Sequence, residues 1–176
     1  LSGLMLKIGT YGLMLLLYLV PLYNILGESI KFRGLPLFNY ILAIFGGITI
    51  ITGTIFAIRQ EDVKKLVAFS SISQMGYIVM ALAISTPLGF TGGLLHLMNH
   101  MIFKTTIFLT MAAVIYRTHT TKMYEMGGLI FRMPVTFAAY LTAIIALAGI
   151  PPTNGFISKW VIYQALIQKG YIFLSV

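Results

Sequence analysis

The chain of 176 residues contains no cysteine and very few carboxylates. The absence of thiols excludes disulfides, thiolate-held zinc, cysteine-ligated iron–sulfur clusters and covalently attached haem. Only four residues are Asp or Glu and only 9% are charged, whereas 59% are hydrophobic. So few charges cannot keep a folded surface in water, and a mean hydropathy of +0.94 agrees with that. The composition therefore predicts a membrane protein.

The few charges are mostly of one sign, which gives a net charge of +8. A basic chain can bind nucleic acid, but these basic residues form no stripe interleaved with aromatic side chains. They flank apolar segments instead, where anionic lipid is the ordinary partner. We therefore expect the lipid bilayer, and no nucleic acid, as a partner.

Long apolar runs fill most of the chain. A spanning helix needs about 20 mostly apolar residues. Such runs lie at 1–26, 37–58, 63–84, 92–116 and 135–167, and a further run starts near 171. The pattern predicts an all-α, polytopic transmembrane helix bundle of about five to six helices, forming a single membrane domain over 1–176. Because the chain starts at Leu1 and ends inside an apolar run, we expect it to be a fragment of a longer subunit.

The connections between these runs differ in basic charge. With helices alternating in direction, one side of the membrane carries six Lys and Arg residues and the other carries three. The more basic side holds the loops 59–65 and 117–133. The positive-inside rule assigns these two loops to the cytoplasm.

The last long run is interrupted by helix-breaking residues. Gly149, Pro151, Pro152 and Gly155 lie close together within it. The prolines remove backbone donors and clash with the preceding turn, so we expect the helix to break there. Unpaired backbone at membrane depth is tolerated only inside protein or beside water. Lys159 follows the break, and a broken helix beside an ionisable residue indicates a transport site.

Titratable residues also occur inside the apolar runs. His96, His100 and Lys104 are spaced i, i+4, i+8 and therefore share one helix face. Lys7 lies near the start of the first run, and Lys159 lies in the last. Such groups are costly in hydrocarbon and usually face a protein interior or a wet path. Histidine titrates near neutral pH, so this row is a candidate path for protons along bridging water.

Other interpretations of these residues stay open. The row can also be a polar seam that only holds helices together, and Lys7 can be an anchor that reaches to the headgroups. His96 and His100 have a spacing that suits a metal, but no carboxylate or cysteine accompanies them. Lys104 would also repel a metal cation, so we expect no metal. The hydroxyl-rich stretch 70–76 predicts close helix packing first and lining of a proton path second.

Four sequence blocks resemble the antiporter-like membrane subunits, in the order in which that family carries them. The second block reads QEDVKKLVAFSSISQMGY and the last reads GIPPTNGFISK; together the blocks cover 6–13, 60–77, 96–104 and 149–159. The family includes proton-pumping subunits of complex I, subunits of multisubunit sodium/proton antiporters, and subunits of membrane-bound hydrogenases and related archaeal complexes.

This resemblance implies two inverted five-helix repeats, of which the chain covers mainly the second. It places Lys7, Lys104 and Lys159 in the family's central line of proton-carrying residues, with His96 and His100 lining the same path. The implied function is proton translocation within a membrane-bound respiratory complex of the NADH-quinone oxidoreductase or hydrogenase type. Redox chemistry would take place in other membrane-complex subunits, so we expect no enzymatic chemistry and no cofactor in this chain.

Two alternatives to this function remain. One is a cation/proton antiporter subunit that exchanges Na⁺ for H⁺ without redox coupling. The other is a conduction-inactive structural subunit of the membrane arm. Two departures from the family pattern stand out: its glutamate–lysine pair of the first repeat is missing, and Leu15 replaces an arginine of some members. The expected location is the plasma membrane of a prokaryote or an energy-transducing organelle membrane.

Overall fold

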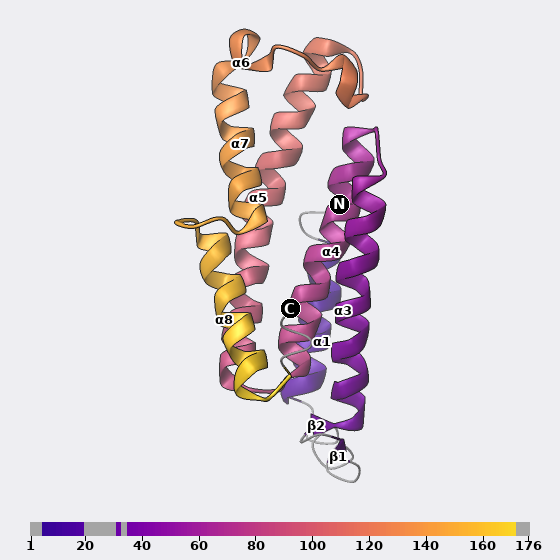
Figure 1. The fold of residues 1–176 in the computed structure, drawn as a ribbon, viewed down its shortest axis with the longest axis vertical. Coiled ribbons are helices and arrows are strands. Elements are labelled where there is room, and N and C mark those ends of the chain that lie inside the picture. The colour runs from indigo at the N-terminus through magenta and orange to yellow at the C-terminus, as the bar shows by residue number, and fades with distance from the viewer. Residues whose placement is uncertain (1–4, 20–30, 33–34, 172–176) are drawn as a thin grey trace.

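The computed structural model describes residues 5–19, 31–32 and 35–171, and helices dominate them (Figure 1). The six longer helices are α1 (Met5–Leu19), α3 (Leu37–Ile58), α4 (Val63–Ala83), α5 (Pro87–Thr118), α7 (Pro134–Ala148) and α8 (Asn154–Gln168). Shorter elements are the 3-10 helix η1 (Met123–Glu125), the helix α6 (Leu129–Arg132) and the strands β1 (Lys31–Phe32) and β2 (Leu35–Pro36). The two strands form an antiparallel hairpin that pairs Phe32 with Leu35.

This architecture confirms the predicted all-helical bundle with one broken helix. The predicted runs 37–58 and 63–84 coincide with α3 and α4 to within a residue. The run predicted at 92–116 is longer in the structure, because α5 begins at Pro87. The Thr86 hydroxyl accepts a hydrogen bond from the Gly89 N–H at 3.0 Å, and a proline at the first helical position has no N–H left unpaired.

The ends of the chain are described only in part. Of the first predicted run, 1–26, the structure describes a helix over 5–19. The remainder of that run, and the further helix predicted to start near 171, lie outside the described residues.

The helix break separates α7 from α8. The chain turns at Gly149, whose φ of +82° suits glycine because it has no Cβ. A Cβ on Gly155 would collide with the carbonyl oxygen of Ala146. As a result α7 and α8 lie end to end along one side of α5 (Figure 1).

The helix α5 lies at the centre of the bundle. It packs against α7 and α8 on one side and against α4 on the other, while α3 pairs with α4. One apolar cluster joins α1 to this arrangement and consists of Met14, Leu17, Ile78, Leu82 and Leu97. One face of α5 therefore lies in the interior of the molecule, while its other side chains are partly or fully exposed.

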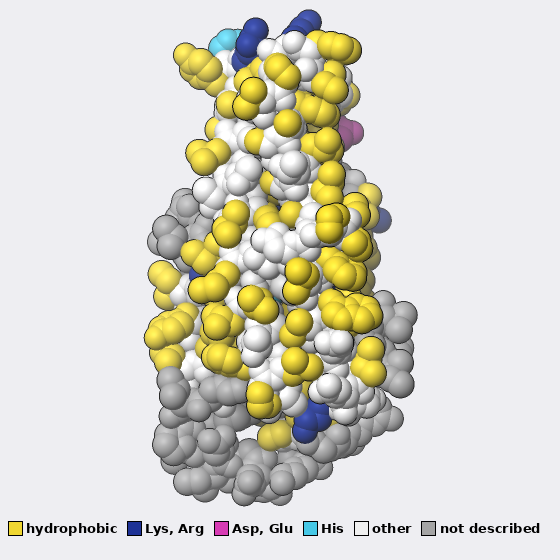
Figure 2. Space-filling model, turned by 90° about the vertical axis from the view of Figure 1, so that its left-hand side faces the viewer, with side chains coloured by type: hydrophobic (Ala, Val, Ile, Leu, Met, Phe, Trp, Pro, Cys, Tyr) yellow, Lys and Arg dark blue, Asp and Glu magenta, His cyan; other side chains and the backbone are white. Residues whose placement is uncertain are grey.

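The outer surface suits a bilayer. Three helices, α3, α4 and α5, are long and apolar enough to cross a membrane. The face shown in Figure 2 is covered mainly by apolar side chains, and the prominent Lys and Arg side chains lie toward its two ends. The length and composition of these helices identify an integral membrane protein.

The two loops predicted to be cytoplasmic lie at the same end of the molecule. The Val63 N–H donates to the carbonyl of Thr121 at 3.0 Å, and the Met123 N–H donates to the carbonyl of Glu61 at 3.1 Å. The β1–β2 hairpin lies at the opposite end (Figure 1). Loops 59–65 and 117–133 therefore share one end of the molecule, and the assignment of that end to the cytoplasmic side stays a prediction.

Candidate functional site

A row of titratable side chains lies in the interior of the bundle. His96, His100 and Lys104 occupy successive turns of α5, and all three are fully or almost fully buried. Their helical spacing directs them to one face, and the packing of α5 turns that face toward α4 and α8. The structure therefore encloses the row in protein, where each polar atom needs a partner.

Lys104 marks one end of this row and is held by α4. Its Nζ donates to the carbonyl oxygen of Val67 at 2.8 Å and to the hydroxyl of Ser70 at 2.7 Å. The same Ser70 hydroxyl donates to the Val67 carbonyl at 2.9 Å. These acceptors compensate part of the cost of placing an ammonium group in the interior.

His96 connects three helices. Its Nδ1 lies 3.0 Å from the hydroxyl oxygen of Ser158 on α8, and its Nε2 lies 3.1 Å from Oε1 of Gln74 on α4. The ring of Tyr77 meets the imidazole edge-on, with 5.9 Å between ring centroids. Both ring nitrogens of His96 are therefore used, and its orientation is determined from two sides.

His100 lies between His96 and Lys104 and differs from both. Its ring stacks on that of His96 with 6.5 Å between centroids. Neither ring nitrogen has a hydrogen-bond partner among the described residues, although both are buried. Buried polar atoms of this kind are usually paired with ordered water, which His100 can bind through one donor and one acceptor.

Lys159 lies at the other end of the row, beside the helix break. Its Nζ donates to the carbonyl oxygens of Leu147 at 3.0 Å and Ala148 at 3.1 Å. These carbonyls belong to the last turn of α7, which has no further intrahelical donors and carries the negative end of the helix dipole. The ammonium nitrogen also lies 5.2 Å from the centroid of the Tyr77 ring. The break therefore forms the binding site of this amine.

Lys7 approaches the row from α1. Its side chain is only 6% exposed, so it lies inside the protein. Its charge acts electrostatically on both His100 and Lys104. All five side chains that we singled out as proton-translocation residues are thus buried and gather around α5.

Three further residues of the site were not named individually from the sequence, although Gln74 lies in the stretch 70–76 that was expected to pack first and to line a proton path second. Gln74 and Tyr77 lie on α4, and Ser158 directly precedes Lys159 on α8. A usable signal existed on α4, because Ser70, Gln74 and Tyr77 follow an i, i+4, i+7 spacing. That spacing forms a second polar face antiparallel to the histidine row. Nothing in the sequence marks Ser158, whose role depends on how α8 is placed.

A pair of asparagines ties α5 to the start of α8. Asn154 Nδ2 donates to Oδ1 of Asn99 at 3.0 Å, and Asn99 Nδ2 donates to the carbonyl oxygen of Asn154 at 3.0 Å. The pair lies one turn from the break and keeps Ser158 and Lys159 in register with the histidines on α5.

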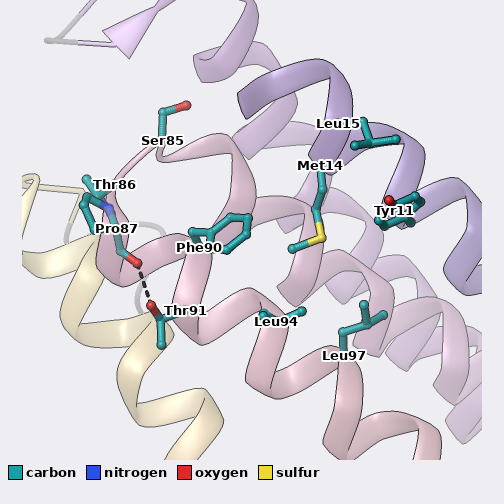
Figure 3. A pocket seen from close by; sticks show the side chains of 10 residues that line it. All are labelled: Tyr11, Met14, Leu15, Ser85, Thr86, Pro87, Phe90, Thr91, Leu94 and Leu97. Carbon is teal, nitrogen blue, oxygen red and sulfur yellow. Dashed lines mark hydrogen bonds between the residues drawn. The ribbon is translucent and has the colours of Figure 1, made fainter. Parts of the chain in front are cut away.

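A cavity of about 730 Å³ lies apart from this row, between α1 and the start of α5. Figure 3 shows Met14 and Phe90 reaching into it from α1 and α5. Its lining is mostly apolar and consists of Tyr11, Met14, Leu15, Ser85, Thr86, Pro87, Phe90, Thr91, Leu94 and Leu97. It contains none of the five predicted site residues, so the buried row, and not this cavity, is the candidate site.

Comparison with known proteins identifies the family. Residues 1–176 match the family model described as NADH:quinone oxidoreductase/Mrp antiporter, TM. The chain therefore belongs to this family of transmembrane subunits, which confirms the resemblance noted in the sequence blocks.

Individual relatives agree with this assignment. Hydrogenase-4 component B of Escherichia coli (strain K12) is 37% identical over 97% of the chain. A chain of the membrane-bound sulfane sulfur reductase, an archaeal respiratory membrane complex, is 45% identical over 99% of the chain with a TM-score of 0.90. A chain of the Mrp complex from Dietzia sp. DQ12-45-1b is 28% identical over 99%, with a TM-score of 0.86.

The chain is much shorter than these relatives. It spans 26% of the hydrogenase component and 30% of each of the two chains of known structure. The part shared with them contains the whole buried row and the helix break.

Proposed function

We propose that this chain is the part of an antiporter-like subunit that moves protons across the membrane within a respiratory complex. The observation that carries the proposal is the buried row of amines and imidazoles from Lys104 through His100 and His96 to Lys159. The family assignment and the likeness to an archaeal respiratory membrane complex support it. The redox chemistry belongs to other subunits in this proposal.

The row can transfer protons because its members alternate between charged and neutral forms. In the proposed sequence a proton leaves the Lys104 ammonium, crosses His100 and His96 with the help of water, and arrives at the Lys159 amine. Lys7 adds or removes a nearby positive charge at the Lys104 end. Two unit charges a few ångströms apart in a protein interact by on the order of a few kcal/mol. That is enough to shift the equilibrium of one transfer step more than tenfold.

The proposal also extends to the partners and location of the subunit. The subunit would lie in the plasma membrane of a prokaryote or in an energy-transducing organelle membrane, with the loops 59–65 and 117–133 on the cytoplasmic side. Neighbouring membrane subunits would supply the conformational or electrostatic change that drives each transfer. The larger number of Lys and Arg residues on the side of these two loops supports this orientation.

The test substitutes the two terminal lysines in the full-length subunit within its complex. We expect Lys104→Ala and Lys159→Ala to abolish proton pumping while the complex still assembles, because each removes a group that carries the proton. The measurement is the number of protons moved per electron in sealed vesicles, with a pH-sensitive dye. Lys122→Ala is the matched control, since that side chain lies in a loop and is 57% exposed. A normal proton-to-electron ratio in both lysine variants would contradict the proposal.

A second candidate function is Na⁺/H⁺ exchange without redox coupling, favoured by the likeness to a chain of an Mrp complex. The two functions differ in what drives the protons. If exchange is the function, an imposed Na⁺ gradient will move protons in vesicles that receive no electron donor. If respiratory pumping is the function, protons will move only during electron transfer and without a need for Na⁺.

A further inference from the structure

His96 lies between α4 and α8, and the hydrogen bonds that it forms with each helix can be followed atom by atom. Its two neighbours, Gln74 and Ser158, come from different helices, and all three side chains are at least nine-tenths buried. The Ser158 hydroxyl has a second partner, since it lies 3.0 Å from the carbonyl oxygen of Gly155. A serine hydroxyl has a single hydrogen to donate and can accept from others.

The contact with Gln74 bears on which nitrogen of His96 carries a hydrogen. The atom that faces Nε2 is the amide oxygen Oε1, which can only accept. With the amide in this orientation, Nε2 carries the hydrogen that forms this bond. In the neutral imidazole, Nδ1 is then an acceptor and points its lone pair at Ser158.

The Ser158 hydroxyl then has two possible hydrogen-bond arrangements, one for each charge state of His96. When His96 is neutral, Ser158 donates its hydrogen to Nδ1 at 3.0 Å. When His96 is an imidazolium, Nδ1 donates to the Ser158 oxygen, and the Ser158 hydrogen turns to the carbonyl of Gly155. The two charge states differ by one proton and by the direction of one hydroxyl group. No heavy atom has to move.

We propose that the Ser158 hydroxyl carries the proton from His96 toward Lys159, and that Gln74 positions His96 for this step. The imidazolium gives its Nδ1 proton to the Ser158 oxygen, while the Ser158 hydrogen turns from the Gly155 carbonyl to a water molecule at the helix break and leaves with it. That water passes a proton to the neutral Lys159 amine. His96 ends neutral, Ser158 is unchanged, and Lys159 ends as an ammonium. This inference rests on the proposed function and names the route of one of its steps.

The groups around His96 agree with a directed transfer. Tyr77 on α4 meets the ring edge-on, and His100 on α5 stacks on it. Lys159 on α8 acts on His96 electrostatically, and Lys7 on α1 acts on His100. A positive charge on Lys159 repels a second proton on His96, so the step can repeat only after Lys159 has released its proton.

The experiment removes the hydroxyl in the full-length subunit within its complex. We expect Ser158→Ala to slow proton translocation about tenfold or more while assembly is normal, because the relay group is lost. Ser73→Ala is the matched control: it removes another buried serine hydroxyl, which bonds Thr54 at 2.9 Å and has no hydrogen bond to His96. The solvent deuterium isotope effect on the rate should rise in Ser158→Ala and not in Ser73→Ala, because the His96 step becomes rate-limiting.

A second variant tests the positioning role and remains available if Ser158→Ala does not assemble. Gln74→Met keeps a similar volume but removes the acceptor of the Nε2 hydrogen, so it should slow translocation and raise the isotope effect as well. The proposal is overturned if Ser158→Ala pumps at the normal rate, if Gln74→Met does so, or if Ser73→Ala is slowed equally. If Lys104→Ala and Lys159→Ala abolish pumping in that case, only the Ser158 step fails; if they do not, the proposed function fails.

Discussion

The two buried lysines at the ends of the row differ in what holds them. Lys104 is bound by α4, an unbroken helix, through the Val67 carbonyl and the Ser70 hydroxyl. Lys159 is bound by two carbonyls at the end of α7, where the helix stops. The first amine therefore depends on a side chain, and the second depends on the shape of the backbone.

This difference has a physical reason. In an unbroken helix each carbonyl already accepts a backbone hydrogen bond, and the Val67 oxygen also accepts from the hydroxyl of Ser71 at 3.0 Å. An amine beside such a helix needs a further acceptor, which Ser70 supplies. At the end of α7 the last carbonyls have no intrahelical donor, so two of them can bind Lys159 without any side chain. Breaking the helix thus creates a site for a cation.

The largest effect should come from a substitution that forces α7 and α8 apart where they meet at the break. In Gly155→Ala the added methyl group would meet the carbonyl oxygen of Ala146, and overpacking of this kind costs about 1–3 kcal/mol. We expect α7 and α8 to be pushed apart, Lys159 to lose its carbonyl partners, and both pumping and the melting temperature of the complex to fall. Gly127→Ala, with no atom within 4 Å of the added Cβ, is the control. An unchanged melting temperature and pumping rate in Gly155→Ala would contradict the account of the break.

A smaller effect is expected at the other lysine. Ser70→Ala removes one of the two acceptors of Lys104 and leaves the Val67 carbonyl. A hydrogen bond to a charged group contributes about 1.5–3 kcal/mol, so the protonated amine becomes less favourable and pumping should slow about tenfold. The Lys159 end should be unaffected. Asn99→Ala perturbs that end, because Asn99 bonds the start of α8. If the two ends are independent, the fold reductions in pumping rate of Ser70→Ala and Asn99→Ala should multiply in the double variant. A strong departure from that product would show that the two ends are not independent.

The smallest effect is expected at the start of α4, the helix that positions Val67 and Ser70. Asp62 caps it: Oδ1 accepts from the Lys64 N–H at 2.8 Å, and Oδ2 accepts from the Thr121 hydroxyl at 2.8 Å. The Thr121 bond, followed by the backbone bonds, holds the pKa of Asp62 below its ordinary value of 3.8. Asp62→Ala should therefore lower the melting temperature of the complex at neutral pH and slow pumping slightly.

The pH dependence of this cap follows from the direction of its pKa shift. The charged carboxylate is favoured by the folded state, so its contribution is complete above pH 3.8 and is lost as the pH falls through the lower pKa of the folded protein. The melting temperatures of the normal protein and Asp62→Ala should converge in that acidic range. Asp62→Asn keeps an N-cap acceptor and should show a smaller loss at neutral pH. A constant difference at all pH values would exclude the carboxylate as the cause.

Much of the fold could be predicted from the sequence because the membrane simplifies it. Runs of about 20 apolar residues must become helices, since no other open structure pairs its backbone inside a bilayer. The runs 37–58 and 63–84 were placed in this way almost to the residue. The start of α5 was placed five residues late, because a search for apolar runs does not register the capping hydroxyl of Thr86.

The site was predicted in part, for a related reason. Lys104, His96 and His100 stand out because titratable residues are rare in apolar runs, and their spacing alone places them on one helix face. Ser70 lay within a stretch for which packing was the first expectation, and the structure shows the hydroxyl bonding Lys104. Ser158 was missed because serine is unremarkable in composition and is significant only through its distance to another helix.

The sequence by itself determined the class of the protein, its spanning helices, the break between them and the titratable residues inside them, because each of these depends on local composition and spacing. Only the tertiary structure decided which acceptors each buried amine uses, and that Ser158 and Gln74 lie beside the two nitrogens of the His96 imidazole. Those features depend on the rotation and height of α4 and α8 relative to α5. Contacts between helices far apart in the chain set that rotation and height, and no local pattern encodes them.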